Sequence, residues 1–454
     1  MGEARPRAVL VGVKLPSGSA RGPLGSVEHE GTTPGSLVEL ERLVATLGYD
    51  VVATVTQARD SLAPAAVIGE GKLKELAALT GGTGDTRPVL PKAKRKVADE
   101  TKEKAEADES EAEGDPGEKV ALIAVDHDIT PSQARNLERA SGVRVLDRTG
   151  VIIEIFSRHA RSREARLQVE IAQLAYTAPR VRESPKGKER QRGRGAGEAA
   201  IELDRRKIRD RIAELKEELA AIQKLGDARR ENRREARRVA LVGYTNAGKS
   251  SLMRALTASD VTVEDKLFAT LDTTVRALVP AARPRVLVSD TVGFIRKLPH
   301  DLVASFRSTL DEALSASLLL YIVDAADPAW ESQLEVTRGV LADIGAKAPA
   351  FVVMNKIDRL DADALAALRR RMPDAWFTSA RSREDVLRVR DGIVAAFEAT
   401  FVSAEVAVPY AKQGLVAEIH ELGLVDEERY EDAGVVVRFR TDPESLARLQ
   451  KKLR

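Results

Sequence analysis

The segment GYTNAGKS (Gly243–Ser250) constrains the fold of this chain more than any other feature. It has the spacing GxxxxGK[ST], and it lies between an apolar run, Val239–Val242, and an amphipathic stretch, Ser250–Leu256. In a phosphate-binding loop the glycines let the backbone curl, so that its N–H groups face a phosphate. The lysine reaches the β- and γ-oxygens and the hydroxyl ligates magnesium. We therefore expect a strand, a phosphate loop and a helix in an α/β domain.

Three further segments follow at the ends of apolar runs: DTVG (Asp290–Gly293), NKID (Asn355–Asp358) and SAR (Ser379–Arg381). The carboxylate of Asp290 can hold the magnesium water, and Gly293 leaves its N–H free to approach a γ-phosphate. Asp358 can accept two hydrogen bonds from the ring and exocyclic nitrogens of guanine, which adenine cannot supply. The segment Ser379–Arg381 suits a backbone contact to the base oxygen. Four segments in this order predict binding of GTP rather than ATP.

Two positions near these segments bear on hydrolysis. In LFATLDTT (Leu267–Thr274) a threonine should bind magnesium when the γ-phosphate is present, and the spacing leaves Thr270, Thr273 and Thr274 open. Phe294 follows Gly293, where many GTPases carry a glutamine that orients the attacking water. Because phenylalanine cannot orient water, we expect slow intrinsic hydrolysis that an external partner accelerates.

The amino-terminal part, residues 1–149, shows strands alternating with helices. Strands are expected at Ala8–Val13, Val51–Thr56, Val120–Val125 and Val143–Leu146, and helices at Ser36–Leu47, Leu73–Leu79 and Pro131–Ser141. This alternation predicts a small parallel α/β domain. The segment from about 80 to 118 interrupts it, because Lys92–Lys119 carries 7 basic and 10 acidic residues in 28 positions. Such a segment cannot bury a core, so we expect a disordered or solvated insertion, with an interaction tail as the alternative.

Residues 150–237 are expected to form a basic helical hairpin. Gly150–Ala178 has the pattern of one long helix, and a Gly/Arg-rich loop follows it. Ile201, Ile208, Leu215 and Ile222 then recur every seven residues, which predicts an amphipathic helix paired with the preceding one. The GTP-binding domain is expected over 238–402. Residues 403–454 should form a small α+β domain of a strand, a helix, two strands and a last helix.

The net charge is only +2, from 72 Lys and Arg against 70 Asp and Glu, which taken alone argues against a nucleic-acid partner. Its distribution reverses this inference. Residues 158–194 hold 11 basic against 4 acidic side chains, and residues 228–238 hold six arginines against two glutamates. Basic runs with glycine suit phosphate backbones, so we expect RNA contact here, with a solvated helix face as the alternative. Aromatic residues are only 4%, which favours electrostatic and shape recognition.

The composition excludes several other classes of protein. The chain has no cysteine, which rules out disulfides, zinc–cysteine sites, iron–sulfur clusters and thiol nucleophiles. No run reaches the roughly 18 apolar residues of a membrane span, and the amino terminus lacks the apolar region of a secretory signal, so a cytoplasmic location is expected. GEGK (Gly69–Lys72) also resembles a phosphate turn. An ordinary turn and helix start is the favoured interpretation, and ATP-dependent RNA remodelling would depend on this segment alone.

Together these segments resemble the HflX family of translation-associated GTPases. The matching segments are Gly243–Leu252, Leu267–Thr274 and Asp290–Phe294, and, outside the GTPase core, Val55–Lys72, Val145–Ala160, Arg166–Tyr176 and Gly195–Ile208. The resemblance covers nearly the whole chain. It is specific, because GTPases in general do not share the amino-terminal segments. The chain departs from the family pattern at Ala199, Ala200, Thr273 and Arg381.

The resemblance implies a P-loop GTPase domain, a smaller amino-terminal α/β domain, a helical hairpin and a small carboxy-terminal α+β domain. It also implies that the chain, working as a monomer, binds the large ribosomal subunit and its RNA. In that family the GTP-bound form splits or rescues stalled ribosomes, and the ribosome stimulates hydrolysis. The alternative is an RNA-binding assembly or hibernation factor for which GTP sets the residence time.

The resemblance also selects site residues. Thr270 becomes the magnesium ligand of the switch segment, and Asn246 stands where related GTPases place a potassium-coordinating asparagine, which makes K⁺ a candidate cofactor beside Mg²⁺. The expected catalytic residues are Lys249, Thr270 and Gly293, and the expected magnesium ligands are Ser250, Thr270 and Asp290. Contacts to GTP or GDP are expected from Gly243, Tyr244, Thr245, Asn246, Ala247, Gly248, Lys249, Ser250, Ser251, Phe268, Ala269, Thr270, Asp290, Thr291, Val292, Gly293, Asn355, Lys356, Asp358, Ser379, Ala380 and Arg381.

Overall fold

The computed structural model describes residues 5–15, 32–86, 119–181, 196–231, 237–258, 267–268, 274–296 and 312–453, with only the backbone for 196–201 and 225–231. The chain divides into two compact units, residues 1–155 and 156–454. Most of the expected charged insertion (87–118) and of the Gly/Arg-rich loop (182–195) lies outside the described residues. Within the described part, no helix is both long and apolar enough to cross a membrane.

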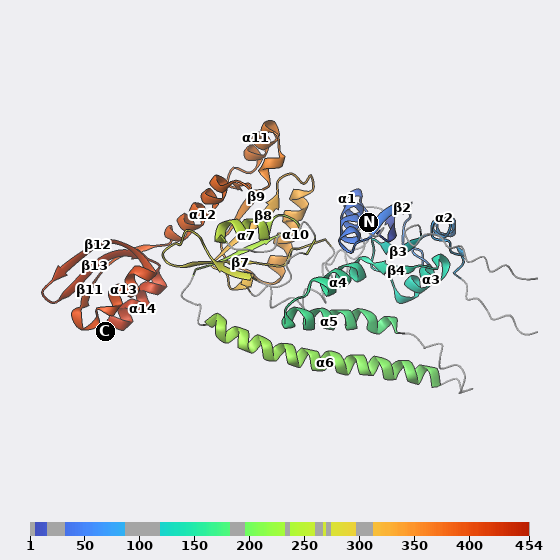
Figure 1. Ribbon diagram of the computed structural model, residues 1–454, viewed down its shortest axis with the longest axis horizontal. Coiled ribbons are helices and arrows are strands. Elements are labelled where there is room, and N and C mark those ends of the chain that lie inside the picture. The colour runs from blue at the N-terminus through green and yellow to red at the C-terminus, as the bar shows by residue number, and fades with distance from the viewer. Residues whose placement is uncertain are drawn as a thin grey trace, which may run out of the picture. The chain divides into compact units, whose positions relative to one another are not determined.

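The first unit is built on a four-stranded parallel sheet with the order β2-β1-β3-β4 (Figure 1). Its elements are β1 (Arg7–Lys14), α1 (Pro34–Thr46), β2 (Asp50–Ala58), α2 (Glu70–Thr80), β3 (Val120–Val125), α3 (Pro131–Ser141), β4 (Arg144–Asp147) and the start of α4 (Arg148–His159). Alternate residues of β1, Val9, Val11 and Val13, pack in one apolar cluster with leucines of α2 and α3. The strand period of two and the apolar helix faces therefore build a shared core. The predicted small parallel α/β domain is confirmed.

Helix α3 shows how local sequence sets an element's bounds. The side chain of Thr130 accepts a hydrogen bond from the backbone N–H of Gln133 (3.2 Å), and the side chain of Gln133 accepts one from the N–H of Thr130 (2.9 Å). This reciprocal cap satisfies two N–H groups that a helix start leaves without partners. Gly142, in the left-handed conformation, ends the helix. The predicted helix over Pro131–Ser141 is confirmed.

The prediction of one helix over Gly150–Ala178 is wrong. Helix α4 ends at His159 and α5 (Arg163–Thr177) begins after Ser162, whose Oγ accepts a hydrogen bond from the N–H of Ala165 (3.0 Å). The intervening residues are mostly polar, so burial does not favour continuing the helix, and the serine caps a new start. Helix α6 (Ala196–Glu231) then packs on α5 through an apolar seam of Leu167, Ile171, Leu174, Ile212, Leu215, Leu219 and Ile222. The predicted pairing of helices is confirmed.

A six-stranded sheet with the order β10-β9-β8-β5-β7-β6 forms the centre of the second unit. Its strands are β5 (Arg237–Gly243), β6 (Thr274–Ala277), β7 (Val286–Asp290), β8 (Leu318–Asp324), β9 (Ala350–Asn355) and β10 (Trp376–Phe377). All pairs are parallel except β6 with β7, and the sequence pattern did not predict β6. The helices are α7 (Lys249–Thr257), α10 (Trp330–Asp343), α11 (Ala362–Arg371) and α12 (Arg383–Glu398), with a 3₁₀ turn η3 (Ile357–Arg359).

Strand β8 separates two apolar layers of this domain. Leu318, Leu320 and Ile322 lie in one cluster with side chains of α7 and α12. Val323 lies in a second cluster with side chains of α10 and α11. Helices therefore cover both faces of the sheet, and the carboxyl ends of its parallel strands meet at one edge. In sheets of this kind, that edge is where ligands bind.

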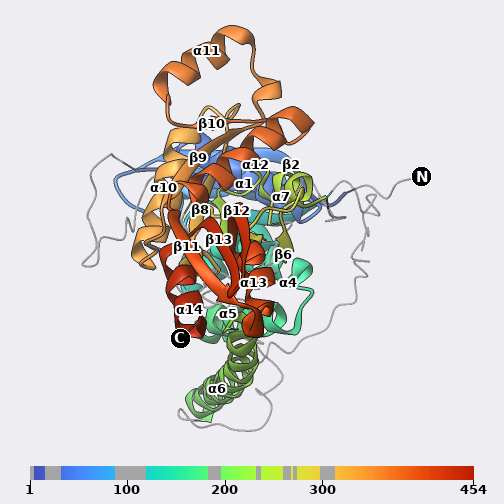
Figure 2. The same ribbon diagram turned by 90° about the vertical axis from the view of Figure 1, so that its left-hand side faces the viewer.

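The remaining residues form a three-stranded antiparallel sheet with the order β11-β13-β12 (Figure 2). The elements are β11 (Val402–Pro409), a 3₁₀ turn η4 (Tyr410–Lys412), α13 (Gly414–Leu422), β12 (Gly423–Glu431), β13 (Gly434–Thr441) and α14 (Pro443–Leu453). Ile419 of α13 and Leu449 of α14 are buried with Val437 and Phe439 of β13, so both helices cover the same face of the sheet.

Candidate nucleotide-binding site

The loop between β5 and α7 curls as the glycines in its sequence predict. Gly243 and Gly248 have φ values of +156° and +92°, and Asn246 lies in the left-handed region at +59°. A Cβ on Gly243 would lie 2.2 Å from the carbonyl oxygen of Ile322, and one on Gly248 would lie 2.2 Å from Nδ2 of Asn355. Any side chain at these two positions would collide with the neighbouring strand ends, so glycine is required there.

Lys249, the first residue of α7, is a buried cation. The residue is 6% exposed, and its Nζ donates to the carbonyl oxygens of Gly243 (3.1 Å) and Tyr244 (2.8 Å). Burial lowers the pKa of Lys249 to about 8, against an opposing effect of Asp290, and the nearby charge of Lys356 lowers it further. A bound phosphate would supply the negative charge that the buried ammonium lacks.

Ser250 and Asp290 bring two oxygen ligands together. The hydroxyl of Ser250 donates to Oδ2 of Asp290 (2.6 Å), and Asp290 is fully buried. The hydroxyls of Ser289 and Thr291, on either side of Asp290, donate to carbonyl oxygens of β5 at 3.2 and 2.8 Å, which fixes the end of β7. A hydroxyl and a carboxylate are hard oxygen donors of the kind that Mg²⁺ takes, so these residues fit the ion.

The segment after Asp290 pairs with the phosphate loop. The N–H of Phe294 donates to the carbonyl of Gly243 (3.1 Å), and the N–H of Thr245 donates to the carbonyl of Phe294 (2.7 Å). Gly293 is pressed against the loop, because a Cβ there would lie 2.9 Å from Cα of Thr245 and 3.0 Å from Nζ of Lys249. The side chain of Phe294 is buried and has no hydrogen-bonding group, so it cannot orient water.

The segments NKID and SAR meet beside the phosphate loop, at the ends of β9 and β10. Asn355 donates through Nδ2 to the carbonyl of Ala247 (2.9 Å) and accepts at Oδ1 from the N–H of Ala380 (3.3 Å). Ser379 donates through its hydroxyl to Oδ1 of Asp358 (2.7 Å). The other carboxylate oxygen of Asp358, Oδ2, lies 3.7 Å from the guanidinium of Arg381. The structure thus gathers both guanine-side segments and the phosphate loop at one edge.

Not every expected site residue falls within the described part. Ala269 and Thr270, and with them Thr273, lie outside it, whereas Thr274 begins β6. Phe268 is buried, and its ring contacts that of Phe156 edge-on, with ring centroids 4.6 Å apart. Of the other expected contacts, Ser251 lies in the first turn of α7 and Val292 is buried behind the loop.

One residue at this edge was missed. Asp324 ends β8, and its Oδ2 lies 2.7 Å from Nζ of Lys356. The apolar run Leu318–Val323 ends at this carboxylate, which was the available signal, but no motif spacing marks it.

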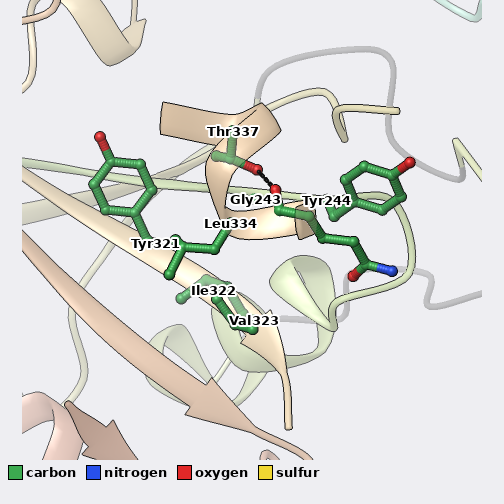
Figure 3. A pocket seen from close by; sticks show the side chains of 8 residues that line it. Gly243, Tyr244, Tyr321, Ile322, Val323, Leu334 and Thr337 are labelled. Carbon is green, nitrogen blue, oxygen red and sulfur yellow. Dashed lines mark hydrogen bonds between the residues drawn. The ribbon is translucent and has the colours of Figure 1, made fainter. Parts of the chain in front are cut away.

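A small hollow lies behind the start of the loop (Figure 3). It is lined by the end of β5, by β8 and by α10. The rings of Tyr244 and Tyr321 lie on opposite sides of it, and the hydroxyl of Thr337 donates to the carbonyl of Gln333 (2.9 Å). The lining is largely apolar, so the charged groups that suit a nucleotide lie at the strand edge instead.

Two other predicted features have structural counterparts. Helix α2 begins after Gly69, and Lys72 pairs with Glu75 at 2.7 Å, as in an ordinary helix start. On the hairpin, Arg211 pairs with Glu170 across the two helices (3.1 Å), and Arg163 pairs with Glu218. Some of the basic excess is therefore neutralised within the hairpin.

Three family models match the chain. The amino-terminal region of the GTP-binding GTPases matches residues 35–87 and 98–157, and the middle region of these GTPases matches 159–236. A family described as 50S ribosome-binding GTPase matches residues 238–356, which contain the phosphate loop, Asp290 and Asn355.

Individual relatives extend this match over the whole chain. A GTPase HflX of Gluconacetobacter diazotrophicus is 58% identical over 450 residues, covering 99% of this chain and 98% of the relative. GTPase HflX of Escherichia coli is 35% identical, covering 88% of each. A GDP-bound GTP-binding protein of Sulfolobus solfataricus aligns at 22% identity with a TM-score of 0.41, covering 86% of this chain and 99% of that one. On the family models and the two relatives named HflX, the chain belongs to the HflX family of GTPases.

Proposed function

We propose that this chain is a ribosome-binding GTPase that acts on the large ribosomal subunit and splits or rescues stalled ribosomes, with hydrolysis stimulated by the ribosome. One observation carries the proposal. The phosphate loop and the DTVG, NKID and SAR segments meet at one sheet edge, and residues 238–356, which contain the phosphate loop and DTVG, match a family described as 50S ribosome-binding GTPase. Because its partner is the ribosome, the chain acts in the cytoplasm, and it acts as a monomer.

The proposed chemistry assigns a role to each group. Lys249 and the backbone N–H groups of the phosphate loop stabilise negative charge on the transferring phosphoryl group. Ser250 and Asp290 would hold Mg²⁺, with Thr270 as a further ligand in the GTP-bound form, and the ion would supply positive charge that offsets the charge of the phosphate oxygens. Asp358 selects guanine, and Asn355 and Ala380 tie the base-side segment to the loop.

The same geometry supports a slow intrinsic rate. In many GTPases a glutamine after the DxxG glycine orients the attacking water, and here that position holds the buried Phe294. A group supplied by the ribosome would complete the site, so that hydrolysis ends the binding event. Loss of the γ-phosphate would then release the switch segments.

Sedimentation of intact ribosomes through sucrose gradients tests the activity. Ribosomes are incubated with the chain and GTP, GDP or a non-hydrolysable GTP analogue. We expect free subunits with the analogue and with GTP, and whole ribosomes with GDP or with Lys249→Ala. Ribosomes that stay whole under every nucleotide would refute splitting. Binding to free large subunits alone would then favour the assembly or hibernation role.

We also propose that the arginine-rich run before β5 contacts ribosomal RNA. Replacing Arg229, Arg230, Arg233 and Arg234 by Gln should weaken ribosome binding. Each lost phosphate contact should lower the slope of log K against log salt by about 0.7–0.9. The exposed Arg369 and Arg370 of α11 provide a control with the same chemistry. An unchanged salt slope in the first variant would make the run a solvated face.

A further inference from the structure

The carboxylate of Asp324, at the end of β8, anchors a side chain that reaches the phosphate loop. Its Oδ2 lies 2.7 Å from Nζ of Lys356, and the two side chains are only 15% and 14% exposed. The same ammonium donates to the carbonyl oxygen of Asn246 in the phosphate loop (2.6 Å). Lys356 therefore bridges the end of β8 and the loop, with Asp324 as its fixed end.

This bridge acts on the orientation of a peptide group. The next carbonyl, that of Ala247, accepts a hydrogen bond from Asn355 (2.9 Å), so two successive carbonyls point toward the base-side segment. In a planar trans peptide the N–H points opposite to the carbonyl. Fixing these carbonyls therefore turns the N–H groups of Ala247 and Gly248 the other way. The N–H groups of such a loop are the ones that bind phosphate oxygens.

The N–H of Ala247 is held only loosely by the protein itself. Its acceptor is the carbonyl of Tyr244 at 3.3 Å, and Lys249 bonds the same carbonyl at 2.8 Å. A long hydrogen bond to a shared acceptor is weak. An anion can therefore take the place of the Tyr244 carbonyl as acceptor at little cost, provided that the peptide group between Asn246 and Ala247 keeps its orientation.

The anchor is itself well positioned. Oδ1 of Asp324 accepts a hydrogen bond from the N–H of Ala326 (3.1 Å), and Asp324 pairs with Asn355 in the parallel ladder between β8 and β9. Lys356 has φ of +61°, a conformation that lysine rarely adopts. Holding a long flexible side chain in one conformation costs rotamer entropy. The sheltered ion pair with Asp324 offsets this cost and so keeps Lys356 on the loop.

We propose that Asp324 is a positioning residue for nucleotide binding: it holds Lys356 on the carbonyl of Asn246 and so keeps the phosphate-binding N–H groups arranged before the nucleotide arrives. The inference rests on the proposed assignment of Gly243–Ser250 as the nucleotide site. Asp324 lies behind the loop and acts through Lys356. Because the loop cradles phosphates that GTP and GDP share, Asp324 contributes equally to the affinity for both.

The first test is Asp324→Asn in the full chain, which removes the charge and keeps the size. Titration with fluorescent GDP and with a fluorescent non-hydrolysable GTP analogue, in Mg²⁺, should show each Kd raised about tenfold, or about 1.4 kcal/mol. Their ratio should not change, and kcat at saturating GTP should stay within about twofold, since the affected contact is made equally before and during phosphoryl transfer. Asp324→Glu should recover part of the affinity.

A double-mutant cycle shows whether Asp324 acts through Lys356. Lys356→Met removes the ammonium but keeps an apolar stem. In that background Asp324→Asn should change Kd by less than about twofold, because its partner has gone. A full tenfold loss in both backgrounds, or none in the wild-type background, would overturn the proposal. Asp327→Asn is the matched control, because Asp327 bonds Ala329 and Gln333 in the turn before α10, and its Kd should match the wild type.

Lys249→Ala separates failure of this inference from failure of the site assignment. If Lys249→Ala binds GDP as tightly as the wild-type chain, Gly243–Ser250 is not the nucleotide site and the proposed function fails with it. If Lys249→Ala loses binding while Asp324→Asn retains it, only the role of Asp324 is wrong.

Discussion

Two sheets in this chain carry charged side chains at the carboxyl ends of their parallel strands, but the charges are used differently. In the four-stranded sheet, the guanidinium of Arg148 lies 2.9 Å from Asp126 and 2.7 Å from Glu39, and Arg148 is 1% exposed. The hydroxyl of Ser36 donates to the second oxygen of Asp126. The guanidinium and the two carboxylates pair with one another within the protein, so this edge is a closed ionic network.

At the edge of the six-stranded sheet the charge of Lys249 is left for a ligand. Among the described residues, the hydrogen bonds of Lys249 go to two neutral carbonyls, and burial depresses its pKa. The N–H groups of a curled backbone and the ammonium of a lysine suit an anion. Polar residues at strand ends therefore do not by themselves make a site. What distinguishes a site is charge that the protein has not already neutralised.

The largest expected effect comes from removing the unneutralised cation. Lys249→Ala should weaken GDP and GTP binding by at least about 30-fold, since truncating one member of a buried charge pair costs about 2–5 kcal/mol. The melting temperature of the nucleotide-free chain should not fall, because the variant also removes a buried charge that folding must desolvate. Calorimetric titration and thermal unfolding without nucleotide measure the two effects. A large loss of stability with retained affinity would erase the contrast between the sheets.

The reverse result is expected from the closed network. Arg148→Leu leaves Asp126 buried without its cation, which should destabilise the first unit by about 3–5 kcal/mol. Hydrogen exchange of the β1 and β3 amides reports that loss. The Kd for GDP should be unchanged under conditions where the variant is folded. Arg144→Ala is the control, because its 2.8 Å contact to Glu154 involves an arginine that is 53% exposed, and about 1 kcal/mol or less is expected.

This contrast also marks what the sequence could predict. The phosphate loop, its flanking strand and helix, and the extent of α3 follow from residues within a few positions of each other, and the sequence pattern predicted them. Asp126 and Arg148 are 22 residues apart, and Asp324 and Lys356 are 32 apart. Their pairing depends on which strands are neighbours and how they are aligned, and a single sequence does not contain that information.

The same reasoning explains the errors in secondary structure. Strand β6 is short, with four residues, and it lies at the edge of the sheet, where it pairs with β7. The break between α4 and α5 depends on one serine, whose cap competes with a continuous helical pattern. In both places a local pattern alone was ambiguous, and a tertiary or capping contact decided the outcome.

A third prediction uses pH to probe the unneutralised cation. The pKa of Lys249 is lowered to about 8 in the nucleotide-free chain, and phosphate binding requires the ammonium. The affinity for GDP should therefore be constant below about pH 8 and fall above it, as binding has to take up a proton. At pH 9 we expect Kd to be about tenfold higher than at pH 7. Titrations at half-unit steps measure this, and a Kd that stays flat to pH 9 would contradict it. The guanidinium of Lys249→Arg stays charged throughout this range, so the Kd of that variant for GDP should be the same at pH 7 and pH 9.

The smallest predicted effect concerns a hydroxyl at the edge of the four-stranded sheet. The side chain of Thr130 caps α3 by accepting from the N–H of Gln133, so Thr130→Ala should destabilise the first unit by about 1 kcal/mol and leave the Kd for GDP unchanged. Thr46→Ala is the matched control, because the hydroxyl of Thr46 only donates to the carbonyl of Arg42 one turn earlier on an exposed helix face. Its effect should stay within about 0.5 kcal/mol. Urea unfolding measures the free energy of unfolding of both variants, and hydrogen exchange of the α3 amides measures the stability of that helix. If Thr130→Ala altered GDP affinity, the edge of the four-stranded sheet would be coupled to the nucleotide site, and the division between a closed network and an open one would no longer hold.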